Sequence, residues 1–363
     1  MNNSLDTLEE NRKKPLSRLL KVGSLFAAAA LTLAGCASGT TSTSSGESST
    51  GETSSSEGTA EVNGDGPHIA VIGGAAFDGF WNIVKNGAES AGAALAAQGG
   101  KMTWLPLQTY DNLGPDAGDL VRDAIGLEVD AIAVPNWVPE AENEAIMDAI
   151  AAGIPVFLYN AGGSEQREIT GAIKYIGTDE YKAGYSGGEY FVANGAKNIL
   201  CINTSPGAVN QETRCQGVAD AATAGGAKSS QLPLPSSTFG DASAVAQAVK
   251  GALIEDETID AIITIGAQDC DAAFSGVEQA DLVGSVAVGT FDMNENVLKR
   301  IQDGTQLFAI DQQPFQQGYM AVSMAWHYVQ YGILSPGDFL TGPSLVTAAN
   351  VAATINGVAL GTR

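Results

Sequence analysis

Short apolar runs alternate with longer amphipathic segments from residue 68 onward. The runs predict strands at 68–73, 102–107, 131–135, 155–159, 173–177, 199–203, 231–235, 261–265, 285–290 and 307–310. Apolar residues recur with helical spacing at 80–97, 117–127, 140–152, 179–192, 211–224, 242–254, 271–280, 294–301 and 315–331. Many of the strands are apolar throughout, as expected where helices cover both faces of a parallel sheet. The pattern predicts an α/β protein with two sheets of about five or six strands each.

Residues 1–66 have a different pattern. Five basic residues precede an uncharged apolar run at 22–33, and the run ends in Leu33-Ala34-Gly35-Cys36. A basic region, a short apolar region and small residues are typical of a secretory signal, and the run is shorter than the ~20 apolar residues that a membrane-spanning helix requires. The final cysteine resembles that of a bacterial lipobox, in which Cys36 would receive a lipid and become the mature N-terminus. A lone buried cysteine after an uncleaved anchor is the alternative, and the Ala-Gly pair before the cysteine disfavours it.

The segment that follows Cys36 fits a tether. It consists mainly of Ser, Thr, Gly and Glu, so it has too little apolar surface to offset the entropy cost of folding. We expect a signal peptide at 1–35 and, at 36–66, a lipidated cysteine with a disordered linker. This predicts an exported lipoprotein that is anchored to the outer face of the cytoplasmic membrane.

Length and charge narrow the classes of function. The chain has 18 basic and 41 acidic residues and a formal net charge of −23. Nucleic acids and anionic membrane surfaces bind clustered Lys and Arg, so this balance argues against both as partners. The roughly 300 residues after the linker exceed a typical single domain, which favours two lobes.

The cysteines and histidines bear on redox and metal chemistry. Cys201 and Cys215 lie on either side of one predicted strand-to-helix connection. In an exported protein, two cysteines at this range predict a disulfide, which leaves Cys270 unpaired. His68 and His327 are the only histidines, so a zinc site has almost no ligands to draw on, and we expect neither a metal nor a cofactor.

Polar and aromatic residues follow the predicted strands, at the edge where open α/β sheets bind ligands. They are Asp78, Phe80 and Trp81 after the first strand, Asn160 after the fourth, Asn210, Gln211 and Glu212 after the sixth, Gln268 and Asp269 after the eighth, Asp292 after the ninth, and Gln312 and Gln313 after the tenth. Carboxylates and amides accept hydrogen bonds from vicinal hydroxyls, and the two aromatic rings offer flat faces to the C–H side of a sugar ring. Each single Asp or Asn has an alternative role as a helix cap or turn residue, but capping does not explain Trp, Gln and Asp on so many strands. The set predicts a site for a neutral sugar or polyol, and a third carboxylate at Glu212 leaves an amino sugar or another small polar metabolite open.

From about residue 67 to the end, the chain resembles a type I periplasmic binding protein of the ribose and simple-sugar branch, which serves ABC importers. The matching motifs are Asp78-Gly79-Phe80-Trp81 followed by Lys85 and Gly87-Ala88-Glu89, Ile154-Pro155-Val156 leading to Asn160, Arg214-Cys215-Gln216-Gly217, Gly289-Thr290-Phe291-Asp292 and Ile310-Asp311-Gln312-Gln313-Pro314. The resemblance implies that Asp78, the two aromatics, Asn160, Arg214, Asp292 and Gln312 contact the ligand, together with Gln268 or Asp269. Asn160-Ala161 replaces the family's Asp-Arg pair, and Glu212 stands where ribose-type members place a further arginine, so ribose itself is disfavoured.

The resemblance also implies a topology and partners. Two lobes with parallel-sheet cores, 67–177 with 314–342 and 178–313 with 343–363, would be joined by crossovers near 177–179, 311–313 and 340–345. A ligand in the cleft would close them by hinge motion. The implied partners are an ABC permease and its ATPase, and the protein would act as a monomer.

Other readings of the sequence predict different functions. Residues 184–188 read G-x-S-x-G, the nucleophile elbow of hydrolases, but Ser186 lies inside a predicted helix rather than at a strand-to-helix turn. Close helix packing accounts for these small residues, and we expect no enzyme. A cytoplasmic repressor of this fold would carry a DNA-binding segment before residue 67, where the signal and linker stand instead. A lipoprotein that presents its ligand to a membrane sensor, rather than to an importer, stays open.

Overall fold

The apolar runs form two six-stranded sheets in the computed structural model, which describes residues 66–363. The first sheet has the order β11-β5-β4-β3-β1-β2, and the second has the order β12-β10-β9-β8-β6-β7. The strands of the first sheet are β1 (His68–Gly73), β2 (Lys101–Pro106), β3 (Ala131–Val134), β4 (Val156–Tyr159), β5 (Lys174–Thr178) and β11 (Phe339–Gly342). Those of the second are β6 (Asn198–Asn203), β7 (Lys228–Pro233), β8 (Ala261–Thr264), β9 (Ala287–Phe291), β10 (Phe308–Asp311) and β12 (Ser344–Thr347). The predicted α/β architecture is confirmed.

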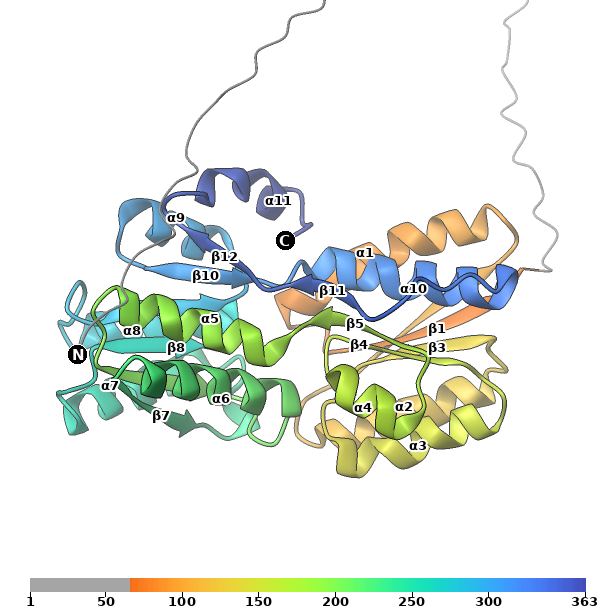
Figure 1. Cartoon of the computed structure of the whole chain (residues 1–363), viewed down its shortest axis with the longest axis horizontal. Helices are drawn as coiled ribbons and strands as arrows, with labels where there is room; N and C mark the ends of the chain where they lie inside the picture. Colours follow the sequence, from red (N-terminus) through yellow and green to blue (C-terminus); the bar gives the residue numbers. More distant parts are fainter. Residues whose placement is uncertain (1–65) are drawn as a thin grey trace, which may run out of the picture. The chain divides into compact units, whose positions relative to one another are not determined.

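Helices cover both faces of each sheet (Figure 1). Those on the first sheet are α1 (Gly79–Ala96), α2 (Leu113–Gly126), α3 (Pro139–Ala151), α4 (Gly163–Thr170) and α10 (Pro314–Tyr331). The helices that accompany the second sheet are α5 (Glu180–Ala193), α6 (Val209–Ala224), α7 (Ala242–Glu255), α8 (Ala267–Gln279), α9 (Glu295–Asp303) and α11 (Ile355–Ala359). Two 3-10 turns, η1 (Ser236–Thr238) and η2 (Val351–Ala353), belong to the same part of the chain. We call the first sheet with its helices the first lobe, and the second sheet with its helices the second lobe.

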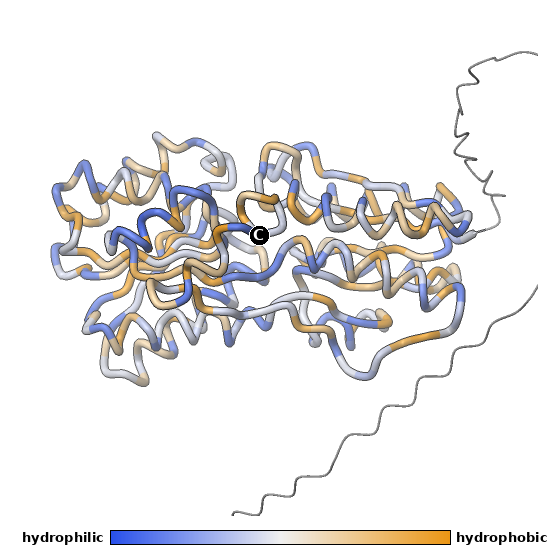
Figure 2. Tube along the Cα trace, turned by 90° about the horizontal axis from the view of Figure 1, so that it is seen from above, coloured by the Kyte–Doolittle hydropathy of each residue, from blue (hydrophilic) through white to orange (hydrophobic). Residues whose placement is uncertain are grey.

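Strand alternation explains how each sheet supports two cores. In β1, Ile69 and Val71 pack on the side of α1 and α10, whereas Ala70 and Ile72 pack on the side of α2 and α3. Successive side chains of a strand point to opposite faces, so a strand that is buried on both faces must be apolar throughout. The helices bury only one side, and Figure 2 shows the result as alternating orange and blue stretches along them.

The two lobes have corresponding strand orders but differ at one edge. In the first lobe β11 pairs parallel with β5, whereas in the second lobe β12 pairs antiparallel with β10. Strands β11 and β12 follow each other directly in sequence, so one short segment supplies an edge strand to each sheet. The segment from β11 to β12 therefore connects an edge strand of one sheet to an edge strand of the other.

The chain passes between the lobes after β5, after β10, and between β11 and β12. These passages are tightly packed, because a Cβ on Gly342 would lie 2.9 Å from the carbonyl oxygen of Asp311 and 3.0 Å from Thr178 Oγ1. The buried Asp311 accepts a hydrogen bond from the Gln313 backbone N–H at 2.8 Å and forms an ion pair with Arg363. Only a glycine fits at position 342 without moving a neighbouring passage.

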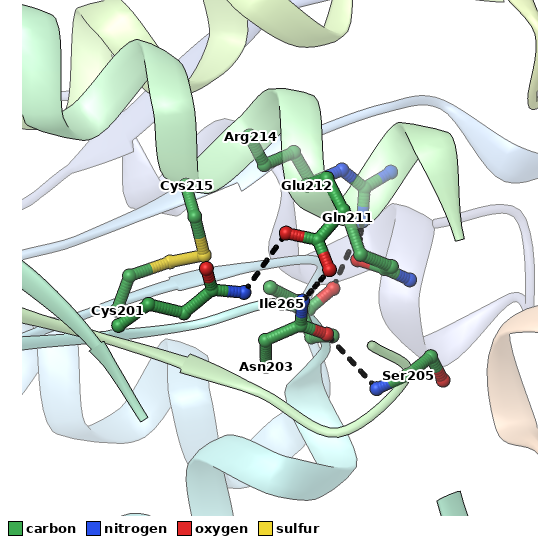
Figure 3. The surroundings of a disulfide bond; sticks show 9 residues. Cys201, Asn203, Ser205, Gln211, Glu212, Arg214, Cys215 and Ile265 are labelled. Carbon is green, nitrogen blue, oxygen red and sulfur yellow. Dashed lines mark hydrogen bonds between the residues drawn. A yellow bond between two sulfur atoms is a disulfide. The ribbon is translucent and has the colours of Figure 1, made fainter. Parts of the chain in front are cut away.

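The predicted disulfide is present. Cys201 in β6 and Cys215 in α6 are bonded, with their Cα atoms 5.7 Å apart (Figure 3). Cys270 is buried and has no disulfide partner within the described part of the chain. The bond joins the central region of the second sheet to the helix that carries Gln211 and Arg214.

The structure differs from the periodicity analysis where elements are short or exposed. Helices α4 and α11 and strands β11 and β12 were not predicted, and none is longer than 8 residues, which is too short to show a clear period. Strand β7 begins at Lys228 rather than 231, because this edge strand is half exposed and its apolar pattern is weak. Helix α8 begins at Ala267 rather than 271, so Gln268 and Asp269 lie in its first turn.

The N-terminal predictions concern residues that the structure does not describe. The expected signal peptide at 1–35, Cys36, and the linker up to residue 65 lie outside the described residues. Within residues 66–363, no helix combines the length and apolar character needed to cross a bilayer.

Candidate functional site

A cavity of about 500 Å³ lies at the carboxyl ends of the strands and is lined by both lobes. Most of the predicted site residues line it: Asp78, Phe80, Trp81, Asn160, Gln211, Arg214, Gln268, Asp269, Asp292 and Gln312. Pockets of ~300–1,000 Å³ are typical of small-molecule sites. The structure thus brings together residues that are separated by more than two hundred positions in the sequence.

The first lobe supplies an aromatic wall. The ring of Trp81 meets those of Phe80, Trp137 and Tyr159 edge to face, at centroid distances of 5.3, 5.4 and 6.0 Å. A Cβ on Gly74 would lie 2.2 Å from the Trp81 ring, so glycine is required where β1 runs into this wall. Edge-to-face contacts fix ring orientation, which gives the wall a defined shape.

Asp78 caps a helix and also lines the cavity. It caps α1, because its Oδ1 accepts a hydrogen bond from the Phe80 backbone N–H at 3.0 Å. Its Oδ2 accepts a second one from the Tyr110 hydroxyl at 2.8 Å. Burial raises the pKa of Asp78 to about 6, although both hydrogen bonds act in the opposite direction. The hydrogen bond from Phe80 holds the Asp78 carboxylate at the cavity wall, where its remaining lone pairs can accept hydrogen bonds from a ligand.

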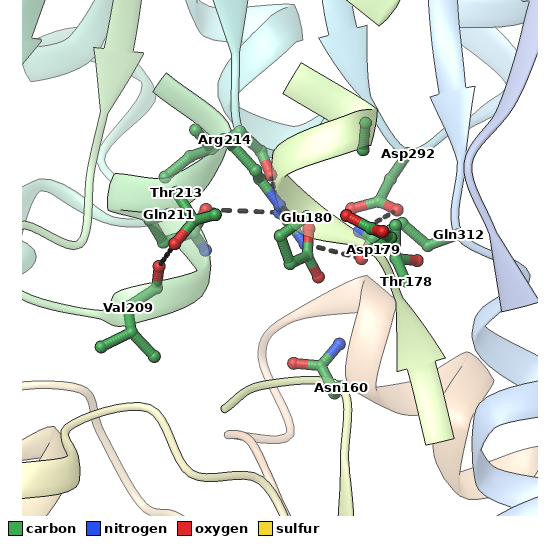
Figure 4. A network of polar contacts seen from close by, with 12 residues as sticks. Asn160, Thr178, Asp179, Glu180, Val209, Gln211, Thr213, Arg214, Asp292 and Gln312 are labelled. Atoms are coloured by element: carbon green, nitrogen blue, oxygen red, sulfur yellow. Dashed lines mark hydrogen bonds and ion pairs between the residues drawn. The ribbon is translucent and has the colours of Figure 1, made fainter. Parts of the chain in front are cut away.

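Asn160 lies across the cavity from the second lobe, at the end of β4 (Figure 4). Its backbone is left-handed, with a φ of 61°, a conformation that Asn tolerates better than most residues. Its Nδ2 donates to Gln317 Oε1 at 3.0 Å, and Gln317 in turn donates to the backbone oxygen of Gln312 at 3.1 Å. Gln317 thereby links the side chain of Asn160 to the backbone where the chain passes between the lobes after β10.

Arg214 organises the polar wall of the second lobe (Figure 4). Its guanidinium makes a bidentate pair with Glu180 at 2.6 and 3.1 Å, and it also donates to the Ile265 backbone oxygen, Gln211 and Gln312. A guanidinium has five N–H donors, and these contacts engage all of them. Burial alone would lower the pKa of Arg214, but the Glu180 carboxylate outweighs it and raises the pKa. Arg214 therefore positions Gln211 and Gln312 and is already neutralised by an ion pair.

Two carboxylates, the buried Asp269 and the half-buried Asp292, complete the polar wall. Asp292, which has a left-handed φ of 62°, accepts from Gln312 Nε2 at 2.8 Å, and Asp269 accepts from Thr204 Oγ1 at 2.6 Å. Burial, with a smaller contribution from the nearby Asp78, raises the pKa of each to about 7. Asp78, Asp269 and Asp292 thus line the cavity without forming an ion pair, which disfavours an acidic ligand.

Gln313 and Glu212 are the residues of the predicted set that do not line the cavity, and Glu212 is held by other contacts. It accepts a hydrogen bond from Asn203 at 3.1 Å, and Figure 3 labels both residues. It also accepts from the Gly207 backbone N–H at 2.9 Å and from Gln231 at 3.1 Å. Helix α6 begins at Val209, and successive residues of a helix point about 100° apart, so Gln211 faces the cavity while Glu212 faces the loops after β6. Glu212 has a local structural role in this arrangement.

Several lining residues were missed by the sequence analysis. Trp137 follows β3 and lines the cavity. Asn210, which the sequence analysis did name, also lines the cavity, and its buried Oδ1 has no hydrogen-bond partner among residues 66–363. Phe239 reaches the cavity from the loop after β7, and Arg363 from the C-terminal segment. Reading the residues after β3 as well would have found Trp137, but Phe239 and Arg363 follow no strand end and carry no local signal. Within the described residues, no cluster of three or more His, Cys, Asp or Glu could hold a metal ion.

The sequence matches the family model described as periplasmic binding protein domain over residues 69–333. Among curated proteins, the xylose/arabinose-binding protein XylF of Sulfolobus acidocaldarius is 28% identical over 258 residues, which are 65% of this chain and 62% of that protein. The match thus spans less than two thirds of that relative's length.

Solved structures with the same fold cover nearly all of the described residues. A carbohydrate transporter from Acidothermus cellulolyticus, in complex with myo-inositol, is 34% identical with a TM-score of 0.74, covering 82% of this chain and 100% of that one. An ABC transporter solute-binding protein from Burkholderia graminis, in complex with D-arabinose, is 24% identical with a TM-score of 0.70, covering 80% and 98%, and supports the fold alone. The names of these proteins describe binding and transport rather than catalysis. With two parallel-sheet lobes around one cavity and a family match over most of its length, this chain belongs to the periplasmic binding protein family.

Proposed function

We propose that this chain is an extracytoplasmic substrate-binding lipoprotein that captures a neutral sugar or polyol between its lobes and delivers it to an ABC importer. One observation carries the proposal: a single cavity joins an aromatic wall from one lobe to a wall of carboxylates and amides from the other. A sugar or cyclitol has an apolar C–H surface and a polar hydroxyl rim, so it complements both walls at once. The ligand would contact Phe80 and Trp81 on one side and Asp78, Asn160, Asp292 and Gln312 around its rim.

The charges of the cavity support a neutral ligand. Its two arginines, Arg214 and Arg363, are paired with Glu180 and Asp311. An acidic ligand would therefore bury a charge beside Asp78, Asp269 and Asp292 without a free cation, which is costly. An amino sugar is the minority option, since its ammonium group would pair with one of these carboxylates.

The named ligands of the relatives narrow the choice of probes. Xylose and arabinose are named for the curated relative, and myo-inositol occupies the transporter that is 34% identical. We infer that the ligand is a single-ring polyhydroxylated compound, and we place cyclitols and pentoses first. Hinge closure around such a ring would bury most of its hydroxyls among the carboxylates and amides that line the cavity.

A thermal-shift and calorimetric screen tests the ligand class. Myo-inositol, D-xylose, L-arabinose, D-glucose and glucosamine should be compared with glucuronate and galactarate as acidic controls. A ligand at 100 times its dissociation constant stabilises the folded state by about 2.7 kcal/mol, which is visible as a rise in Tm. Stabilisation by the acidic compounds alone would contradict the proposal.

Membrane anchoring is proposed from residues 1–36 alone. Replacing Cys36 by Ser should release the protein or leave an unprocessed precursor, as measured by fractionation and by the mass of the N-terminal peptide. Unchanged fractionation and an unchanged N-terminal peptide would contradict lipidation. Crosslinking to a co-expressed permease would distinguish delivery to an importer from presentation to a membrane sensor.

A further inference from the structure

Three aromatic rings from the two lobes meet beside the cavity. Phe77 lies between β1 and α1, Tyr110 between β2 and α2, and Phe239 after η1 in the second lobe. The ring centroids are 5.0 Å apart for Tyr110 and Phe239, 5.6 Å for Phe77 and Tyr110, and 6.2 Å for Phe77 and Phe239. These distances fall in the favourable range of ~4.5–7 Å for aromatic pairs. We call these three residues the aromatic clasp.

The clasp is connected to the site through Tyr110. Its hydroxyl accepts from the Ala75 backbone N–H at 3.1 Å and donates to Asp78 Oδ2 at 2.8 Å. The ring of Phe239 packs on the Tyr110 ring at an interplanar angle of 86°. Phe239 itself lines the cavity, whereas Tyr110 does not. Tyr110 therefore acts on the ligand only through Asp78, and Phe239 acts both directly and through Tyr110.

A second contact between the lobes accompanies the clasp. The backbone N–H of Val209, in the second lobe, donates to the backbone oxygen of Trp137, in the first, at 2.8 Å. Ala208, next to it, is buried in the core cluster that contains Trp81 and Trp137. Contacts of this kind form only while the lobes are together, so they favour the closed state over the open one.

We propose that Phe239 and Tyr110 are positioning residues of the ligand site: closure seats Phe239 on Tyr110, and this contact holds Asp78 toward the ligand and delays ligand release. The proposal deepens the proposed function and rests on it. Loss of a contact that is specific to the closed state speeds reopening. It changes the initial encounter of the ligand with the open cleft much less.

The hydrogen bond from Tyr110 to Asp78 should affect the pKa of Asp78, and therefore the pH dependence of ligand affinity. A purely structural role of Tyr110 would leave that pH dependence unchanged. Asp78 faces the Tyr110 hydroxyl, Asp269 from α8 and Asp292 from the end of β9. Burial raises the pKa of Asp78, and the hydroxyl counteracts that rise. Removing the hydroxyl should therefore raise this pKa further, so that the carboxylate loses its acceptor capacity at a higher pH.

Two variants and two matched controls test the proposal, with myo-inositol and D-xylose as probes. Phe239→Ala should raise the dissociation rate constant about tenfold, while the association rate constant changes less than about threefold. Tyr110→Phe should weaken binding and shift the midpoint of the affinity–pH profile upward. The controls are Tyr319→Ala, which removes an exposed ring stacked within α10, and Tyr331→Phe, which removes a hydroxyl that donates to Gln98. Both controls should match the wild type in rates and pH profile.

A measurement without ligand separates this proposal from the proposed function. Small-angle scattering of the full chain should show a larger radius of gyration for Phe239→Ala than for the wild type and Tyr319→Ala. If no sugar or polyol binds but the radius of gyration increases in Phe239→Ala, the proposed function is wrong, whereas the inference that the aromatic clasp holds the lobes together is supported. Unchanged dissociation rates in Phe239→Ala, or a pH profile of Tyr110→Phe that superimposes on the wild type, would overturn the positioning role. An unchanged radius of gyration in ligand-free Phe239→Ala would show that the aromatic clasp does not hold the lobes together, whether or not a ligand is found.

Discussion

The two walls of the cavity come from lobes with corresponding strand orders, yet they are held in place by different forces. Trp81 and Trp137 in the first lobe are oriented by edge-to-face packing. Arg214, Gln312 and Asp292 in the second lobe form a chain in which each member neutralises or orients the next. The α/β frame thus determines where side chains converge, while the chemistry of each wall depends on which partners are buried with them.

This difference predicts unequal tolerance to substitution. A packed aromatic wall loses contact area when one ring is trimmed, and its neighbours can relax toward the gap. A buried polar wall has no such adjustment, because removal of one member leaves another charged or polar group without a partner. The second lobe should therefore be the more fragile wall for stability, and both walls should matter for binding.

The largest effect is expected from Arg214→Met. It leaves Glu180 buried without its cation, and breaking a buried pair in this way costs about 3–5 kcal/mol of unfolding free energy. Urea denaturation measures it. The exposed Arg122 pairs with Asp119, and Arg122→Met should cost less than about 1 kcal/mol. The double variant Glu180→Gln with Arg214→Met should recover part of the loss, and equal costs for Arg214→Met and Arg122→Met would contradict the difference between buried and exposed pairs.

The disulfide should have the next largest effect and should act on one lobe. Cys201 and Cys215 are separated by 14 positions, and closing a loop of this length contributes about 3 kcal/mol in the chain-entropy model. The paired variant Cys201→Ser with Cys215→Ser should lower the unfolding free energy by this order. Hydrogen exchange should increase first in the second lobe. The control is wild-type protein with its disulfide intact, under the same non-reducing conditions. An equal increase in both lobes of the variant would show that the lobes unfold as one unit.

Binding should depend on both walls. Asp292→Ala removes a half-buried carboxylate that would accept a hydrogen bond from a ligand hydroxyl. Hydrogen bonds to charged groups contribute about 1.5–3 kcal/mol, so affinity should fall at least tenfold. Trp81→Ala should weaken binding through the other wall. Ser186→Ala is the control, because the Ser186 hydroxyl donates to the Ala183 backbone oxygen within α5. Calorimetry with full affinity in either wall variant would remove that wall from the site.

The last prediction concerns pH, which should act with opposite signs on stability and on binding. Burial raises the pKa of Asp78 to about 6 and those of Asp269 and Asp292 to about 7, so the folded state binds protons more tightly than the unfolded state. The stability of the ligand-free protein should therefore rise by about 1 kcal/mol or more between pH 8 and pH 5.5. Affinity should fall over the same interval, because protonation removes acceptors.

Substitutions assign the pH effect to the walls. Asp269→Asn or Asp292→Asn should flatten the stability–pH profile measured by urea denaturation at each pH, and Asp78→Asn should do so less. Asp119→Asn, which alters an exposed carboxylate, should leave the profile unchanged. A wild-type stability that rises with pH between 5.5 and 8 would contradict the sign.

Sequence reasoning predicted the candidate site by one topological rule. Reading the residues after each predicted strand found Asp78, Asn160 and Asp292, because the carboxyl ends of parallel strands meet at one edge. The same rule could not separate Gln211 from Glu212, because their directions depend on where α6 begins. Nor could it find Phe239, which reaches the cavity only through the loop between β7 and α7.

Local pattern by itself determined all strands except β11 and β12, the long helices, the α/β class, the disulfide pair and the general place of the cavity. These follow from periods of two and 3.6 residues and from neighbours in sequence, which act over a few positions. The tertiary structure alone decided which groups neutralise one another. Arg214 meets Gln312 across 98 positions, and Asn160 meets Gln317 across 157. A buried charge or amide acquires its pKa, its orientation and its availability to a ligand from such distant partners, and no local pattern in the sequence specifies them.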